Sequence, residues 1–152
     1  MLQEGNDRFI AGKCNHPNTD VFRIADTGGN GQHPFAVVVT CADSRVPVER
    51  LFDRGVGDLF VIRVAGNICD PNEAGSIEYA CEHLGSQLVV VMGHTKCGAV
   101  TAAISGADGG KNVNSLLDNI APAVQTVKAA HADLAPADLV DAVVHENVWQ
   151  SI

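Results

Sequence analysis

Two cysteines and one histidine have the residue types and positions expected of a zinc site. Cys41 comes directly after the apolar run 35–40, and His94 and Cys97 follow the run 88–92. If these runs are parallel strands, all three side chains reach the same carboxyl edge of a sheet, where open α/β sheets place their sites. Two thiolates and one imidazole are preferred zinc ligands, and a site with three protein ligands leaves one position open, as catalytic zinc sites do. The spacing therefore predicts a catalytic zinc site.

Asp43 and Arg45 follow Cys41 closely enough to act beside such a metal. A carboxylate next to a zinc-bound water accepts a hydrogen bond from it, which selects hydroxide or a protonated ligand at the metal. Arg45 would keep Asp43 ionised and oriented through a fork-like ion pair. Two alternatives stay open: Asp43 could bind the zinc itself and close its fourth position, or the two residues could form a surface salt bridge of little energetic value.

The apolar runs that would position these residues are typical of buried parallel strands. Three runs are almost continuously apolar and rich in β-branched residues, at 35–40, 59–64 and 88–92. Such strands are usually covered on both faces. Helix-like stretches at 47–52 and 72–84 alternate with them, which predicts βαβ units with right-handed crossovers.

Helices are also expected at both ends of the chain. The pattern predicts them at 2–12, 99–104, 113–130 and 137–152. Pro122 should kink or break the third of these, because proline lacks the amide hydrogen that an interior helical position uses. Residues 13–34 are expected to be irregular, with a flexible glycine-rich loop at 27–31.

The composition of the chain excludes some classes of function. The chain has 152 residues, of which 46% are hydrophobic and 18% charged, and its formal net charge is −8. These values predict one ordered domain and argue against nucleic acid or an anionic membrane as the main partner. No apolar stretch approaches the roughly 18 residues of a membrane span, and the first residues lack the pattern of a signal peptide, so we expect a cytoplasmic protein. Five scattered cysteines form a poor disulfide framework and a better source of metal ligands or buried thiols.

Three sequence motifs together resemble those of the β-class carbonic anhydrases. They are Cys41-Ala42-Asp43-Ser44-Arg45-Val46, Arg63-Val64-Ala65-Gly66-Asn67 and His94-Thr95-Lys96-Cys97-Gly98-Ala99. The resemblance implies an α/β fold with a mainly parallel sheet core flanked by helices. It further implies a single domain over 1–152, with an N-terminal helical arm at about 1–34, a zinc-binding core at about 35–105 and C-terminal helices at about 112–152. Members usually continue past the last helix, so we expect the sheet to lack the family's C-terminal edge strand.

The same resemblance implies an activity and a ligand set. One Zn²⁺ per chain would be held by Cys41, His94 and Cys97, with Asp43 and Arg45 as the dyad beside it. The implied reaction is the reversible hydration of carbon dioxide to bicarbonate and a proton by zinc-bound hydroxide. The working unit would be a homodimer or a dimer of dimers.

Two further residues are candidates for contacts with the substrate. Gln32 lies nine residues before Cys41, where plant-type members carry a glutamine that hydrogen-bonds bicarbonate, and the amide of Gly98 could help to orient the substrate. Two other functions stay open. They are hydrolysis of carbon disulfide or carbonyl sulfide at the same site, and a non-catalytic zinc protein in which Asp43 permanently fills the fourth position.

Overall fold

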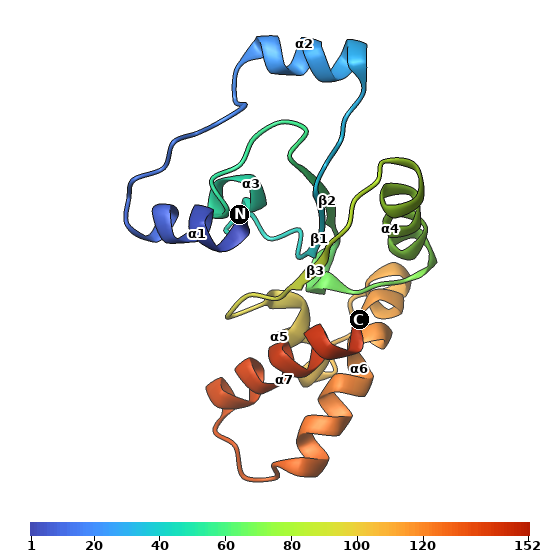
Figure 1. Ribbon diagram of the computed structural model, residues 1–152. Helices are drawn as coiled ribbons and strands as arrows, with labels where there is room; N and C mark the ends of the chain where they lie inside the picture. The colour runs from blue at the N-terminus through green and yellow to red at the C-terminus, as the bar shows by residue number, and fades with distance from the viewer. The chain divides into compact units, whose positions relative to one another are not determined.

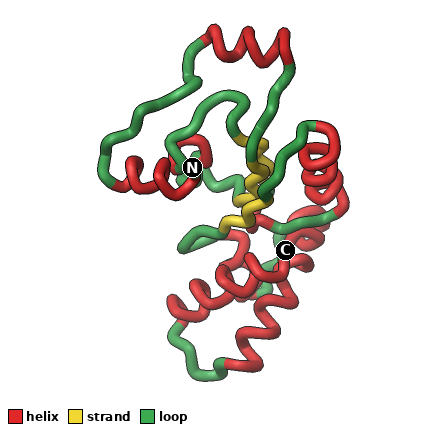
Figure 2. The backbone as a smooth tube through the Cα atoms, in the orientation of Figure 1, coloured by secondary structure: helices red, strands yellow, loops and turns green.

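The computed structural model describes all 152 residues, whose contacts divide the chain into two compact units. The first unit comprises Met1–Val38, Ser44–Ile62 and Gly75–Val90, and the second comprises Val39–Asp43, Arg63–Ala74 and Val91–Ile152. Figure 1 labels the helices and strands along the chain, and Figure 2 shows their distribution between helix, strand and loop.

Three parallel strands form one sheet in the order β2-β1-β3. They are β1 (Ala36–Thr40), β2 (Leu59–Arg63) and β3 (Val89–Met92). Near the strand beginnings, the amide of Phe35 donates to Asp58 O at 3.0 Å and that of Val37 donates to Leu88 O at 2.8 Å, so the strands start side by side. All five residues of the central strand β1 are buried, as its unbroken apolar run predicted. The outer strands are less buried than predicted: β2 is partly exposed and β3 has no buried residue. The predicted α/β fold with a mainly parallel sheet is confirmed, and each strand boundary lies within one residue of its predicted place.

In the first unit, the N-terminal part of the chain is more helical than its sequence predicted. Helix α1 (Leu2–Ile10) lies within the range expected for it, and α3 (Val48–Leu51) follows β1. A further helix, α2 (Val21–Asn30), occupies a segment that was expected to be irregular, so that prediction was wrong. The reason is a cap: the side chain of Asp20 accepts hydrogen bonds from the amides of Phe22 and Arg23, two donors that have no partner within a first helical turn.

Helices dominate the second unit. Helices α5 (Gly98–Ser105), α6 (Lys111–Ala130) and α7 (Pro136–Gln150) contact one another, and α5 also contacts the short 3-10 turn η1 (Ala65–Asn67). Their shared core contains the fully buried side chains of Val100, Ile120, Ala123 and Val143. Helix α4 (Pro71–His83) begins in this unit and continues in the first one. None of the helices is both long and apolar enough to cross a membrane.

Of the kink or break expected at Pro122, the break does not occur. Helix α6 runs without interruption from Lys111 to Ala130 with Pro122 inside it. Proline removes the hydrogen bond to the carbonyl four residues earlier, that of Asp118. Both Pro122 and Asp118 are exposed, so water can satisfy that carbonyl. The neighbouring side chains of Ile120, Ala123 and Val124 are buried, and their packing holds the helix on both sides of the proline.

Candidate metal centre

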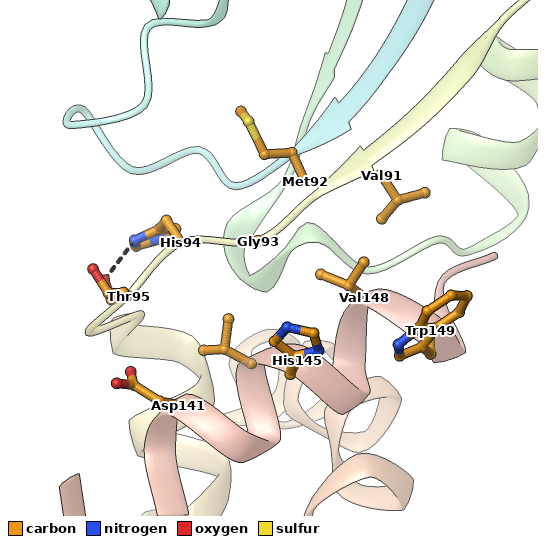
Figure 3. A pocket seen from close by; sticks show the side chains of 10 residues that line it. Val91, Met92, Gly93, His94, Thr95, Asp141, His145, Val148 and Trp149 are labelled. Carbon is orange, nitrogen blue, oxygen red and sulfur yellow. Dashed lines mark hydrogen bonds between the residues drawn. The ribbon is translucent and has the colours of Figure 1, made fainter. Parts of the chain in front are cut away.

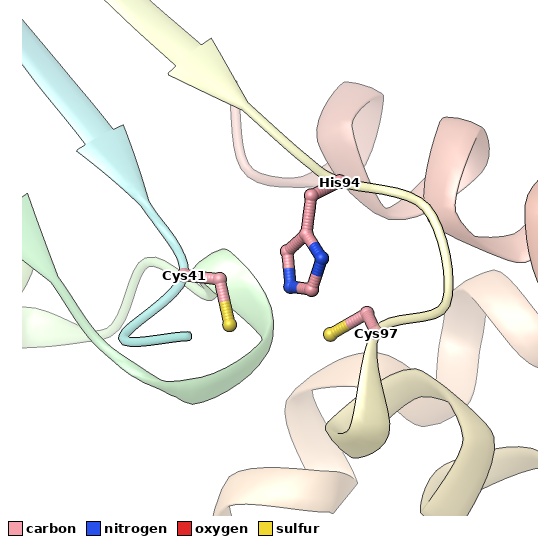
Figure 4. Close-up of side chains that lie close together, drawn as sticks. All are labelled: Cys41, His94 and Cys97. Carbon is pink, nitrogen blue, oxygen red and sulfur yellow. The ribbon is translucent and has the colours of Figure 1, made fainter. Parts of the chain in front are cut away.

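The second unit brings the three predicted ligands together. Cys41 follows β1 directly, His94 lies two residues after β3, and Cys97 is the N-cap of α5. The hydroxyl of Thr40 donates to the carbonyl of Met92 at 3.0 Å and so joins the two strand ends that precede these residues. One ligand atom from each of the three lies within 4.8 Å of the others. Figure 4 shows the two sulfur atoms and the imidazole ring facing one common space.

The imidazole of His94 is held in the form that a metal requires. Its Nδ1 lies 2.9 Å from the backbone carbonyl of Thr95, and because a carbonyl can only accept, Nδ1 carries the proton. The other nitrogen, Nε2, is therefore an unprotonated donor atom when the ring is neutral. That nitrogen is buried and has no hydrogen-bond partner in the protein. A buried polar atom without a partner costs free energy, and a metal ion in the common space would remove that cost.

The two sulfur atoms are buried, which disfavours a pair of free thiolates. Cys41 is 4% exposed and Cys97 1%. Burial raises the pKa of the Cys97 thiol and the nearby Cys41 raises it further, while the amides of Val100 and Ala99 at the start of α5 act in the opposite direction. Two neighbouring thiolates in a buried place need a cation between them. Two sulfurs and an unprotonated imidazole nitrogen form a donor set that suits zinc, so the residues present fit that metal.

Backbone hydrogen bonds hold the loop that carries Cys41. The guanidinium of Arg63 donates to the carbonyls of Cys41 at 3.2 Å and Asp43 at 2.6 Å. The amide of Gly66 donates to Cys41 Sγ at 3.3 Å, and the side chain of Asn147 donates to the carbonyl of Gly66 at 2.7 Å. Arg63 and Gly66 were noticed only as part of a motif, and Asn147 was missed because nothing in the sequence near the cysteines points to a residue on the last helix.

Asp43 also lies near the candidate ligands. Its side chain is 22% exposed, and Oδ2 lies 3.8 Å from His94 Nε2, which is too far for a hydrogen bond. The other three predicted site residues are exposed. Arg45 lies in the turn that precedes α3, Gln32 in the segment between α2 and β1, and Gly98 is the first residue of α5. Their roles stay predictions.

A cavity of about 450 Å³ opens beside His94 in the second unit. Its walls come from the end of β3 and from α7 (Figure 3), where Val91, Val148 and Trp149 contribute apolar surface and Asp141 and His145 contribute polar groups. The two candidate cysteine ligands do not line it. The cavity therefore reaches the candidate metal centre only at the histidine.

Comparisons with known proteins point to one family. The family model described as carbonic anhydrase matches residues 36–152. Carbonic anhydrase 2 of Mycobacterium tuberculosis is 46% identical over 127 residues, which are 81% of this chain and 61% of that protein. This chain thus spans about three fifths of the length of that relative.

Solved structures of β-carbonic anhydrases have a fold similar to that of this chain. A β-carbonic anhydrase of Coccomyxa, in complex with acetazolamide, superposes with a TM-score of 0.77 at 27% identity, covering 99% of this chain and 68% of that one. One of the two tetrameric β-carbonic anhydrases described from the ascomycete Sordaria macrospora superposes with a TM-score of 0.78 at 25% identity, covering 99% of this chain and 76% of that one.

Proposed function

The chain belongs to the β-class carbonic anhydrase family, and on that basis we propose that it catalyses the reversible hydration of carbon dioxide to bicarbonate and a proton. Cys41, His94 and Cys97 would hold one zinc ion. The observation that carries the proposal is the convergence of these three ligand atoms within 4.8 Å, with the buried Nε2 of His94 left without a partner. All three residues fall inside the part of the chain that matches the family.

Zinc, when bound, would supply the nucleophile of this reaction, because it strongly lowers the pKa of a bound water, to about 7. The chain's own residues set how that chemistry proceeds. Two thiolates donate more charge to the metal than imidazoles would, so we expect the activity to favour alkaline pH. The hydrogen bond from His94 Nδ1 to the Thr95 carbonyl fixes the ring in the orientation in which Nε2 faces the metal.

Asp43 would orient the attacking group. Its Oδ2 lies 3.8 Å from His94 Nε2, so the carboxylate would be near enough to a metal held by that nitrogen to accept a hydrogen bond from a group bound to the metal. Arg63 fixes the main chain at Asp43 through its carbonyl and so limits where the carboxylate can go. Arg45 would keep the carboxylate ionised. The same proximity would let Asp43 occupy the fourth position on the metal in a closed state.

Stopped-flow measurement of carbon dioxide hydration by the zinc-loaded protein, between about pH 7 and 9, tests this function. We expect turnover that rises with pH and that falls by roughly 100-fold or more in Asp43→Asn, the usual range for loss of a positioned proton acceptor. Asp133→Asn is the matched control, because Asp133 is exposed between α6 and α7, and it should behave as the unchanged protein does.

Absence of turnover at every pH, with one zinc bound per chain, would contradict the proposal. Carbon disulfide and carbonyl sulfide would then be tried on the same samples, and inactivity toward all three substrates would favour the non-catalytic zinc protein.

The proposal extends to the assembly and to the bicarbonate contacts. We propose a homodimer or a dimer of dimers, which the tetrameric Sordaria relatives support and light scattering after size exclusion would test. Gln32 and the amide of Gly98 are the proposed contacts with bicarbonate, so Gln32→Ala should raise KM more than it lowers kcat.

A further inference from the structure

A buried asparagine on the last helix reaches the candidate metal centre through one glycine. Asn147 is 1% exposed, and its Nδ2 donates to the carbonyl of Gly66, 81 residues away, at 2.7 Å. The amide of the same glycine donates to Cys41 Sγ at 3.3 Å. Helix α7 is therefore joined to a candidate metal ligand by two consecutive hydrogen bonds, both of them buried.

The turn between these two bonds has a conformation that needs support. Gly66 has φ 76° and ψ 14°, and the next residue, Asn67, has φ 45°, so two successive residues lie in the left-handed region. A single main-chain bond, from the Asn67 amide to the Val64 carbonyl at 3.1 Å, closes the turn. The Gly66 amide and carbonyl belong to neighbouring peptide planes joined at a flexible glycine, so a bond that holds the carbonyl also limits where the amide can point. The side chain of Asn147 makes such a bond.

We infer that Asn147 is a positioning residue for the metal centre, an inference that rests on the proposed function. By fixing the Gly66 carbonyl, it aims the Gly66 amide at the Cys41 sulfur. An N–H···S bond withdraws electron density from a thiolate and so reduces the charge that the thiolate donates to a bound metal. The amides of Val100 and Ala99 act on Cys97 in the same sense. Loss of Asn147 would therefore leave the Cys97 sulfur with its amide hydrogen bonds and the Cys41 sulfur without one.

A purely structural role for Asn147 predicts something different. In that case the side chain would only satisfy a buried carbonyl, and its removal would lower stability without changing the electronic state of the sulfur. Val143 supplies the matched control, because it is fully buried, lies one turn earlier on the same helix and belongs to the same core. Val143→Ala weakens the packing of α7 and leaves the bonds of Gly66 in place.

The test uses Co²⁺ in place of zinc and reads the thiolate-to-cobalt charge-transfer band. In Asn147→Ala we expect this band to move to longer wavelength at unchanged intensity, because the sulfur lone pair rises in energy while both thiolates still bind. Competition with a chelator should show Co²⁺ affinity lower by roughly 10- to 100-fold, because the loss of orientation of the Cys41 sulfur outweighs its greater electron donation. Val143→Ala should leave the band in place even where it lowers the melting temperature more. Asn147→Leu, which keeps the branched shape of the side chain and has no donor, replaces Asn147→Ala if the latter does not fold.

The outcomes separate this inference from the proposed function. If the unchanged protein shows no charge-transfer band with Co²⁺, the assignment of the metal centre is wrong, and the inference fails with it. A band in the unchanged protein that does not move in the Asn147 variants, or that moves equally in Val143→Ala, overturns the positioning role and leaves the metal centre intact.

Discussion

A side chain at position 66 would enter space that other atoms already occupy. A β-carbon built there lies 2.6 Å from Ile120 Cδ1 and 3.2 Å from the β-carbon of Ala99, and the backbone at this residue has a φ of 76°. Both restrictions disfavour residues other than glycine. Because the Gly66 amide donates to Cys41 Sγ, the tight packing of α5 and α6 against this turn also determines the surroundings of a candidate metal ligand.

Gly66→Ala should lower the free energy of unfolding by about 2–4 kcal/mol, through left-handed strain and overpacking. It should also weaken metal binding, since the turn must shift. Gly75→Ala is the matched control, because that glycine lies inside α4 with open space around its β-carbon. It should raise stability by about 0.5–1 kcal/mol through helix propensity. Urea unfolding of both variants measures the two changes in the free energy of unfolding. A decrease in both variants, or in neither, would contradict this explanation.

The three candidate metal ligands could be predicted as neighbours from the sequence. Cys41 and His94 follow apolar runs that are typical of parallel strands, and parallel strands end at one edge, although only the strand before Cys41 is fully buried. Cys97 lies three residues after His94 and therefore stays near it. Asn147 could not be predicted, since its contact with Gly66 depends on how α7 packs in the core. No local pattern in the sequence carries that information.

At the scale of elements, α2 shows that an N-cap can make a segment helical even where its composition suggests a loop. Gly28 and Gly29 lie inside this helix, where glycine is unfavourable by about 1 kcal/mol relative to alanine. None of the residues of α2 is buried, so packing contributes little to it. The carboxylate of Asp20, which accepts from two amides of the first turn, is the main local feature that favours the helix.

Asp20→Ala should therefore destabilise α2 without unfolding the protein. Loss of an N-cap costs about 0.5–2 kcal/mol, and a helix without buried side chains has little to hold it besides the hydrogen bond from Arg23 Nε to the Val56 carbonyl. Amide hydrogen exchange is the measurement, and residues 21–24 should exchange faster while those of β1 keep their protection. Unchanged exchange in α2 would show that the cap is not what holds this helix.

At the scale of the whole molecule, the candidate chemistry and the most strongly perturbed carboxylate lie in different compact units. The three candidate ligands belong to the second unit, and Asp53 belongs to the first. Asp53 is 2% exposed, accepts hydrogen bonds from the amides of Asn15 and His16, and pairs with Arg8. The Asn15 amide is the largest cause of a pKa lowered to about 2, and Arg8 and the His16 amide contribute to it against the effect of burial.

This pKa makes stability depend on pH in acid. A carboxylate whose pKa is lower when folded stabilises the protein fully above its unfolded pKa of about 3.9, and that contribution is lost as pH falls toward 2. Urea midpoints measured between pH 6 and 2 should fall steeply below about pH 4. Asp53→Asn should start from a lower midpoint at pH 6 and lose less on acidification. Parallel curves for the two proteins would show that Asp53 is not the group responsible.

Zinc K-edge X-ray absorption of the zinc-loaded protein tests the central claim most directly, because it identifies the atoms bound to the metal. We expect two sulfur scatterers from Cys41 and Cys97, together with the imidazole pattern of His94. Cys41→Ser should lose one of the two sulfurs, whereas Cys81→Ser, on α4 and outside the cluster, should keep both. A shell of nitrogen and oxygen atoms without sulfur, or a sulfur count unchanged in Cys41→Ser, would contradict the assignment of this metal centre.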